Sequence, residues 1–418
     1  MPCCAVGACL SLARPDNSAQ LLTLHLAGAR IARGRGRRER RGPFLCWGVV
    51  DGGLLRRRRA YDGWWVEEEA MPWEDVKSVF RAETAHMGVM KVDPERCTRP
   101  RGSRCRLCSE NCPFGAWEIV GEREVPRQKT GWDCFSCYNC MVACPRGAIT
   151  IVESYHVDDG FWATDPHPLP AKLPLQPLDA GGRPDKWNAI ERAVFYRRSV
   201  RNYKDKPVPE TLIRRVLEAG RFAPSAGNCQ PWKFIVVTNK ALLREMDEAV
   251  VNVLEPLYHM YMDDEQVKTL ALGWEANPNP GGWDPRVVLG GYGSLVRRDL
   301  RPLLNAPAVI LILADARAVS GPDINIGICG QNMNLVANSL GIKACWVGFI
   351  QALNVVPSLT EKLGIAYPWS IRASVTLGYP RFKQEGIVPR EFRPVTWFRE
   401  GSDGPEIEDG SGSREING

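Results

Sequence analysis

The chain has 418 residues, of which 44% are hydrophobic and 9% aromatic, as in a globular protein of two or three domains. No apolar run approaches the roughly 18 to 20 residues that span a bilayer, so no membrane anchor is expected. The net charge of +6 is concentrated near the start, because residues 1–70 hold twelve arginines and seven acidic residues. The remainder is close to neutral, which excludes an extended nucleic-acid-binding surface.

Residues 1–86 form an arginine-rich arm, in which ARIARGRGRRERRGPF and LLRRRRAY show no helical or strand period. Disorder is the expected state of such a segment. Two alternatives stay open. Arg40–Arg41 resembles a twin-arginine export signal, although its spacing is one residue too long and Asp51 interrupts the apolar stretch. Otherwise translation begins at Met71 or Met87, and the arm is a misread upstream segment.

The fifteen cysteines are not spread evenly, as a disulfide framework would be. Eight of them lie between Cys97 and Cys144. Clustered cysteines without a convincing secretory signal indicate metal ligation in a reducing compartment, so a cytoplasmic protein is expected.

The run Cys134-x2-Cys137-x2-Cys140-x3-Cys144-Pro145 sets three thiols in one tight loop and a fourth just beyond it. Three ligands so close suit the corners of an iron–sulfur cubane, whereas zinc usually draws two ligand pairs from separated knuckles. A related run lies upstream, Cys97-x7-Cys105-x2-Cys108-x3-Cys112-Pro113. Both runs end alike. The upstream run ends in NCPFGAWEIV, and the downstream run ends in ACPRGAITIV.

This duplication resembles the bacterial two-cluster ferredoxin domain, here over residues 87–155. In that family the fourth cysteine of each run crosses over to the other cluster. The resemblance implies one [4Fe–4S] cluster on Cys97, Cys105, Cys108 and Cys144, and a second on Cys112, Cys134, Cys137 and Cys140. The first run departs from the pattern, since seven residues separate Cys97 from Cys105 where two are usual. Either that loop is longer, or Cys97 does not ligate and the cluster has three irons; zinc is the alternative to iron–sulfur.

Residues 156–185 contain six prolines and predict an extended linker. Periodicity after it predicts helices over 186–198, 209–222, 241–254 and 324–342, and strands over 232–239, 308–315, 343–350 and 370–379. The expected fold over 186–398 is therefore α+β, a mixed sheet flanked by helices. A disordered tail, 399–418, is expected to follow.

Two segments of this domain carry chemistry. RRSVRNY, residues 197–203, sets three arginines around Ser199, and guanidinium and hydroxyl groups suit a phosphate or the polar edge of a flavin. A solvated basic helix end is the alternative. APSAGNCQPWKFIVV, residues 223–237, begins with a small-residue loop whose backbone N–H groups can approach a planar ligand, with Asn228 and Gln230 at its edge.

Together with GICGQNMNLVANSLGIKACWVG, LGYP and PREFRP, these segments resemble the nitroreductase family of FMN enzymes over residues 186–398. By that resemblance Arg197, Arg198 and Ser199 hold the FMN phosphate and ribityl chain, joined by Arg390 or Arg393. Arg201 lies near flavin N1 and O2, and the backbone N–H groups of Val347 and Gly348 face N5. The second subunit of a homodimer contributes Pro224, Ser225, Ala226 and Asn228.

Residues 250–305 form a longer insertion than compact family members have, with aromatic residues at 258, 261, 274, 283 and 292. A lid that stacks on the substrate and ordinary dimer packing are the two interpretations. Cys229, Cys329 and Cys345 are expected to pack as small apolar residues. The histidines at 156, 167 and 259 show no ligand spacing, and no GxGxxG follows a strand, so no dedicated dinucleotide domain is expected.

The expected function is an FMN-dependent oxidoreductase with two [4Fe–4S] clusters. Electrons enter through the clusters or as hydride from NAD(P)H, with reduced ferredoxin as another donor, and leave to a nitro, quinone, enone or halogenated organic acceptor. The alternatives are substrate oxidation that delivers electrons to a ferredoxin pool, and a relay subunit whose partner carries the substrate chemistry. No nucleic-acid or membrane partner is expected.

Overall fold

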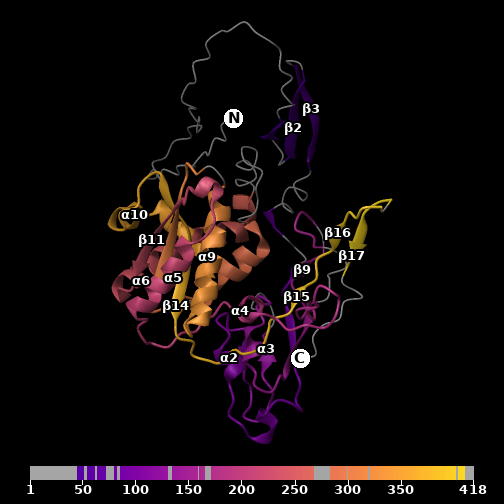
Figure 1. Ribbon diagram of the computed structural model, residues 1–418. Helices are drawn as coiled ribbons and strands as arrows, with labels where there is room; N and C mark the ends of the chain where they lie inside the picture. Colours follow the sequence, from indigo (N-terminus) through magenta and orange to yellow (C-terminus); the bar gives the residue numbers. More distant parts are fainter. Residues whose placement is uncertain are drawn as a thin grey trace. The chain divides into compact units, whose positions relative to one another are not determined.

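The computed structural model describes residues 45–50, 54–61, 64–71, 80–81, 85–129, 134–158, 160–164, 171–267, 283–298, 300–318, 321–401 and 403–409 (Figure 1). The chain divides into Met1–Phe44 and Leu45–Gly418, and everything below concerns the second unit. Among the described residues, no helix combines the length and the apolar character needed to cross a membrane.

Three strands lie within the arginine-rich arm: β1 (Leu45–Val50), β2 (Leu54–Tyr61) and β3 (Trp64–Met71). They pair antiparallel in the order β1-β2-β3. The β2–β3 register sets Arg57 opposite Glu68 and Arg58 opposite Glu67. The arm was expected to be disordered over 1–86, and these three strands differ from that expectation.

Short elements over residues 85–158 form a domain that we call the cysteine domain. Its strands pair antiparallel, two by two: β4 (Ala85–His86) with β9 (His156–Val157), β5 (Val89–Val92) with β8 (Ile149–Glu153), and β6 (Trp117–Glu118) with β7 (Arg127–Gln128). Helix α2 (Leu107–Glu110) precedes Cys112 and α3 (Asn139–Ala143) precedes Cys144, so the two halves repeat one order of elements. Met90, Trp117 and Ile149 pack among the thiols in the core.

The region 186–398, which we call the sheet domain, is built around four antiparallel strands in the order β11-β12-β14-β13. Their bounds are β11 Trp232–Val237, β12 Ala308–Asp315, β13 Lys343–Val347 and β14 Trp369–Gly378. A mixed sheet was expected. Among the described residues, parallel pairing at this sheet is confined to a single bridge between Ser199 and Ala344.

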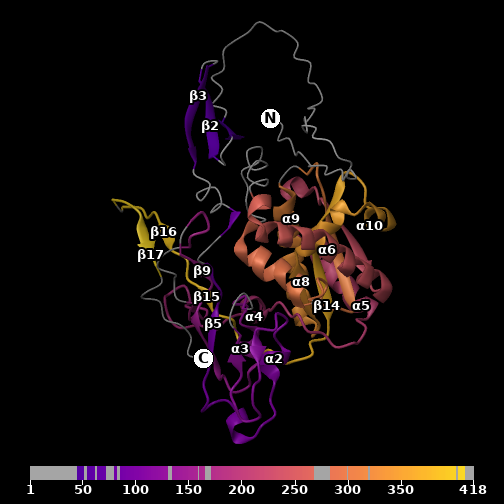
Figure 2. The same ribbon diagram turned by 180° about the vertical axis from the view of Figure 1, so that it is seen from behind.

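Both faces of this sheet are covered by helices, which explains why β12 is apolar from Ala308 to Ala314 (Figures 1 and 2). Even-numbered residues of β12 such as Ile310 pack with α5 (Glu210–Arg221) and α9 (Pro322–Ser339). Odd-numbered residues such as Leu311 pack with α6 (Lys240–Met262), α8 (Gly293–Arg298) and η5 (Phe349–Val355). Successive strand residues point to opposite faces, so a strand buried on both sides shows no polar alternation.

The predicted helices and strands of the sheet domain all occur, with shifted ends. Helix α4 is Ala189–Tyr196, begun by a capping box of Asn188 and Glu191, and α10 is Pro357–Lys362. Helix α6 continues past Pro256 to Met262, so part of the predicted insertion belongs to it. A π-helix, η4 (Arg286–Tyr292), follows later in that insertion.

The proline-rich linker and the tail also carry strands. Within the linker, β10 (Ala171–Lys172) pairs with β15 (Arg390–Glu391) of the sheet domain. Within the tail, β17 (Glu406–Glu408) pairs with β16 (Val395–Trp397). The described part of the tail was expected to be disordered and forms this hairpin instead.

Candidate active site

Four cysteines line one small cavity in the cysteine domain: Cys97, Cys105, Cys108 and Cys144. The fourth comes from the second cysteine run, so the structure brings together the set that crosses between the two halves. Burial raises the pKa of the Cys108 thiol to about 11, and the neighbouring Cys105 and Cys144 thiols act in the same direction. Cys97 lies on the cavity wall despite the long segment before Cys105.

The other four cysteines also lie together, and we call them the second cysteine set: Cys112, Cys134, Cys137 and Cys140. Burial and then the charges of Cys137 and Cys112 raise the pKa of Cys140, and the same two neighbours contribute to the raised pKa of Cys134, about 12. Cys134 and Cys140 are each only 4% exposed. Thiols this buried cannot hold the thiolate form alone. A metal cation supplies the missing charge, so the donor set fits an iron–sulfur cluster.

The two halves hold their last cysteine in the same way. The Ala116 N–H donates to Cys112 Sγ at 3.4 Å, and the Ala148 N–H donates to Cys144 Sγ at 3.4 Å. Each turn uses a glycine of positive φ, 63° at Gly115 and 56° at Gly147, a conformation that other L-residues rarely adopt. The repeated cysteine–proline–x–glycine–alanine sequence is therefore also a repeated thiolate-binding turn.

The RRSVRNY segment runs alongside β13. Ser199 forms a parallel bridge with Ala344, and the Val200 N–H donates to the Ala344 carbonyl at 3.0 Å. This pairing holds the segment extended after α4 ends, which carries its arginine side chains past the first residues of β13.

Several cationic side chains gather at this point. Arg198 is 5% exposed, and none of its three guanidinium nitrogens has a hydrogen-bond partner within the described residues. Burial lowers the pKa of Arg198 to about 10, and the charges of Arg390 and Arg197 lower it further. The pKa of Lys343 is lowered by burial and by Arg198. A buried, unpaired guanidinium is costly, so this group of residues fits an anion such as the phosphate of FMN.

Arg390 and Arg393 are placed differently. The charge of Arg390 acts on both Arg197 and Arg198. Arg393 is exposed and forms an ion pair with Glu391. Of the two arginines proposed to join the phosphate group, the structure brings only Arg390 to the other cations.

Arg201 faces the cysteine domain. Its guanidinium carbon lies 5.6 Å from the centre of the Phe114 ring, and Nη1 donates to the Ser199 carbonyl at 3.4 Å. Burial opposes its charge, yet the pKa of Arg201 is raised because Cys345, Cys137, Tyr203 and Cys112 lie near it. The predicted position near flavin N1 and O2 therefore also borders the second cysteine set.

The small-residue loop begins before β11 and turns through η2 (Ala226–Asn228), with positive φ at Gly227, Asn228 and Gln230. Ser225 Oγ accepts from the Gln230 N–H at 3.0 Å, and the loop side chains from Cys229 to Gln230 are exposed. Its predicted contact across a dimer stays a prediction. At the far end of β13, a Cβ added to Gly348 would meet nothing within 4 Å, so the backbone there borders open space.

Buried amides join the two domains. Asn139, between two cysteines, donates to the Ser199 carbonyl at 3.1 Å, and Asn202 donates to the Asn111 carbonyl at 3.0 Å. Asn111 in turn donates to the Asn139 carbonyl at 2.9 Å and accepts from Gln384 at 2.8 Å. Asn111 and Asn139 are only 1% and 3% exposed. The RRSVRN segment is thus bonded directly to the loops that carry Cys112, Cys137 and Cys140.

The insertion also reaches the cysteine domain. A Cβ added to Gly290 of η4 would lie 2.4 Å from the ring of Phe135, which stacks on Phe114 with centroids 4.4 Å apart. Tyr261 is 2% exposed and stacks with Trp283 at 6.5 Å, so these aromatic residues pack against each other. Trp274 lies outside the described residues.

Comparison with known proteins identifies the family to which the chain belongs. The model of the nitroreductase family matches residues 194–379, and a 4Fe-4S dicluster domain matches residues 102–149. A 5,6-dimethylbenzimidazole synthase from Rhodospirillum rubrum is 41% identical over 221 residues, which cover 50% of this chain and 89% of that protein. The chain belongs to the nitroreductase family.

A chloronitrobenzene nitroreductase from Comamonas testosteroni is 26% identical over 198 residues, covering 46% of this chain and 86% of that protein. The solved structure of an FMN-bound nitroreductase from Desulfitobacterium hafniense aligns with a TM-score of 0.38 at 23% identity, covering 49% of this chain and 96% of that one. As a member of this family, the chain is an FMN-dependent oxidoreductase with a ferredoxin-type 4Fe-4S domain before its flavin domain.

The structure also corrects one of the thiol expectations. Cys329 and Cys345 are buried as predicted, but Cys229 is exposed, since its loop turns away from the core. The junction residues Asn111, Asn139, Asn202 and Phe114 were missed. Their side chains are ordinary in type, and only the proximity of Asn111 and Asn139 to cysteines could have singled them out.

Proposed function

We propose that this protein carries two [4Fe–4S] clusters and one FMN per chain, and that electrons pass between the clusters and the flavin to reduce a small organic acceptor. The two crossed cysteine sets described above would each hold one cluster. When bound, the clusters supply one-electron transfer, and the flavin converts between one- and two-electron steps.

The observation that carries this proposal is the amide network between the domains. Asn139 and Asn111 flank the second cysteine set, and they bond to the segment proposed to hold FMN. Buried polar groups in such a network fix one geometry, because breaking a bond would leave an amide unsatisfied. The second cysteine set is therefore the one we assign to exchange with the flavin, and the set with Cys97 is the outer one.

The residues of the flavin site have distinct roles in this proposal. Arg197, Arg198, Lys343 and Arg390 neutralise the phosphate, with Ser199 at the ribityl chain. Arg201 supplies positive charge at the pyrimidine edge of the flavin, where negative charge collects on reduction. The backbone at Val347 and Gly348 faces N5, supported by the open space beside Gly348.

A nitroaromatic compound is the acceptor that we favour, since similar proteins are named chloronitrobenzene and nitrobenzene nitroreductases. Quinones, enones and halogenated aromatics remain in the same class of acceptor. NAD(P)H or a reduced ferredoxin is the donor. The reverse flow, from a substrate to a ferredoxin pool, would use the same residues.

A second candidate function is synthesis of 5,6-dimethylbenzimidazole. It is supported by the 41% identity to the Rhodospirillum rubrum synthase over 221 residues. Chromatography of aerobic reaction mixtures distinguishes the two candidate functions, because nitro reduction yields no 5,6-dimethylbenzimidazole.

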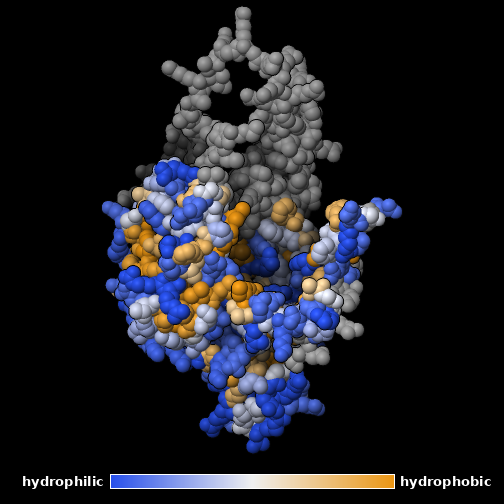
Figure 3. Space-filling view, in the orientation of Figure 1, coloured by the Kyte–Doolittle hydropathy of each residue, from blue (hydrophilic) through white to orange (hydrophobic). Residues whose placement is uncertain are grey.

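We further propose a homodimer in the cytoplasm. Large apolar side chains remain exposed on the sheet domain, including Phe222, Ile324, Ile328 and Trp346. Ile324 and Ile328 are one helical turn apart on α9, as a packed helix face requires. Figure 3 marks hydrophobic surface on this domain in orange. Oxygen-sensitive thiolate clusters favour a reducing compartment.

The test measures the rate of flavin reduction by stopped-flow absorbance, after the clusters have been reduced under anaerobic conditions. The protein used has verified iron and FMN contents. Asn202→Leu removes the bond to Asn111 and should slow flavin reduction at least tenfold. Asn332→Leu is the matched control, because Asn332 makes a similar amide bond to the Ala219 carbonyl away from the junction. Equal rates in both variants and the parent would contradict electron exchange across this junction.

A further inference from the structure

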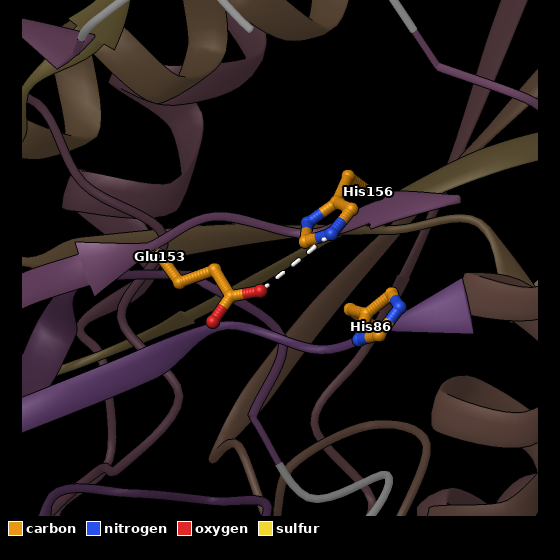
Figure 4. A group of neighbouring side chains, drawn as sticks. All are labelled: His86, Glu153 and His156. Atoms are coloured by element: carbon orange, nitrogen blue, oxygen red, sulfur yellow. Dashed lines mark ion pairs between the residues drawn. The ribbon is translucent and has the colours of Figure 1, made fainter. Parts of the chain in front are cut away.

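Two histidines and two carboxylates converge in the cysteine domain, at the strands that begin and end it; Figure 4 shows three of them. His86 ends β4 and lies opposite His156, the first residue of β9. Glu153 ends β8, and Asp158 follows β9. Residues two apart on a strand share a face, so Asp158 lies on the face of His156, and its cross-strand partner His86 lies there too.

The donor atoms are spaced as a metal would need them. His86 Nε2 lies 2.8 Å from Asp158 Oδ2, and His156 Nε2 lies 3.5 Å from Asp158 Oδ1 and 3.6 Å from Glu153 Oε1. In a tetrahedral zinc site with bonds of about 2.1 Å, neighbouring donors stand about 3.4 Å apart. The observed separations lie around that value. One donor atom from each of His86, Glu153 and His156 fits within 4.8 Å.

The charges favour a cation. In the described part of the chain, Glu153 and Asp158 form ion pairs with the two histidines and with no lysine or arginine. Imidazole binds metal in its neutral form, so a divalent ion would balance the two carboxylates. Two nitrogen and two oxygen donors are a common set for zinc.

Two separate surface salt bridges would not account for the carboxylate that the two histidines share. The two imidazoles stack with centroids 4.5 Å apart and planes 12° apart, and each Nε2 approaches a different oxygen of the same Asp158 carboxylate. This carboxylate therefore bridges both histidines, as it would beside a shared ion.

We propose that His86, Glu153, His156 and Asp158 form a binding site for one divalent transition-metal ion, preferably zinc. Binding requires small rotations of the two imidazoles out of their stack, which bring both Nε2 atoms to the ion. The β4–β9 pair contains only two residue pairs, so it contributes little stability by itself. A bound ion would fasten the strand that enters the cysteine domain to the strand that leaves it.

The experiment uses the full chain with its iron loaded, dialysed against micromolar zinc and then against metal-free buffer. Metal analysis should find one zinc per chain, and none above background in the double variant His86→Ala/His156→Ala, at equal iron content. His259→Ala is the matched control, since His259 is an exposed histidine beside Glu255 at 3.8 Å. It should keep the zinc.

Thermal unfolding gives a second measurement that does not depend on metal retention through dialysis. Zinc should raise the midpoint of the parent and of His259→Ala, but not that of the double variant, because only a site present in the folded state stabilises it. Equal zinc in the parent and the double variant would overturn the proposal. Zinc that binds only as iron is lost would also overturn the proposal, because the zinc would then be bound by the cysteines.

Discussion

Arg198 lies buried beside Arg197, Arg390 and Lys343 with no hydrogen-bond partner among the described residues. We expect Arg198→Met to weaken FMN binding about 10- to 100-fold, the loss typical of a charge-assisted hydrogen bond. Binding of riboflavin, which lacks the phosphate, should stay the same. Fluorescence titrations with both ligands check this. An equal loss for FMN and riboflavin would mean that Arg198 does not contact the phosphate.

Arg201 borders both proposed cofactors, through the Phe114 ring and the second cysteine set. We expect Arg201→Ala to bind FMN but to lower the flavin potential by about 20 to 60 mV, which corresponds to about 1 to 3 kcal/mol of charge stabilisation on a two-electron couple. The potential of one cluster should fall as well.

Anaerobic redox titration measures both shifts. Arg221→Ala is the control, because Arg221 covers the ring of Phe222 at 4.4 Å on an exposed part of α5. If Arg201→Ala loses FMN and the remaining flavin keeps its potential, the arginine holds the phosphate instead.

At the scale of these residues, the sequence predicted which residue types bind the cofactors, but not which residues lie next to them in the fold. The arginines and cysteines were recognisable because their motifs are local. His86 and His156 were not, since strand pairing joins residues far apart in the chain. Arg393 resembled Arg390 in sequence. The structure separates them, because the charge of Arg390 acts on Arg198, whereas Arg393 forms an ion pair with Glu391.

At the scale of elements, α6 carries a buried acid that makes stability depend on pH. Asp247 is 4% exposed and accepts from the Leu303 N–H at 2.7 Å, and burial raises its pKa from 3.8 to about 6. Between these values the folded state binds more protons than the unfolded one, so this group's contribution to stability falls as pH rises from 4 to 6.

Asp247→Asn keeps the acceptor and removes the charge. We expect its thermal midpoint to exceed that of the parent at pH 7.5 and to approach it at pH 5, with a difference of up to about 3 kcal/mol in unfolding free energy. Circular dichroism melts at the two pH values measure this. Glu245→Gln, on the exposed face of the same helix, should show no such dependence.

Helix η4 docks against the cysteine domain through Gly290, which has no room for a side chain beside Phe135. We expect Gly290→Val to push the Phe135 ring aside and expose the second cysteine set, so that its iron is lost to a chelator several-fold faster. Gly327→Val is the comparison, because a Cβ at Gly327 meets nothing within 4 Å. Equal iron loss in both variants would show that η4 does not protect the cluster.

Elements were the most predictable level. Strong periodicity located α5, α6, α9 and the four sheet strands, and the buried run of β12 could only be a central strand. The strands in the arm, the linker and the tail were missed, because β10 and β17 are only two and three residues long and depend on distant partners.

At the scale of the whole molecule, the proposal fixes a stoichiometry. Native mass spectrometry should find a dimer of the 46.6 kDa chain. Chemical analysis should find close to eight iron atoms and one FMN per chain, because each crossed cysteine set holds four irons. About seven iron atoms, with a three-iron signal after oxidation, would mean that Cys97 is not a ligand. Zinc in place of iron would refute the cluster assignment.

The pairing of β10 with β15 bears on how this protein can be taken apart. The predicted linker contains β10, which pairs with β15 of the sheet domain. Lys172 of β10 lies opposite Arg390, the arginine proposed to bind the phosphate. A recombinant flavin module cut at residue 186 would leave β15 without its neighbour, whereas one that starts before residue 171 would retain it. A separately expressed flavin domain should therefore begin before residue 171, nearer to the cysteine domain than the end of the proline-rich segment at residue 185.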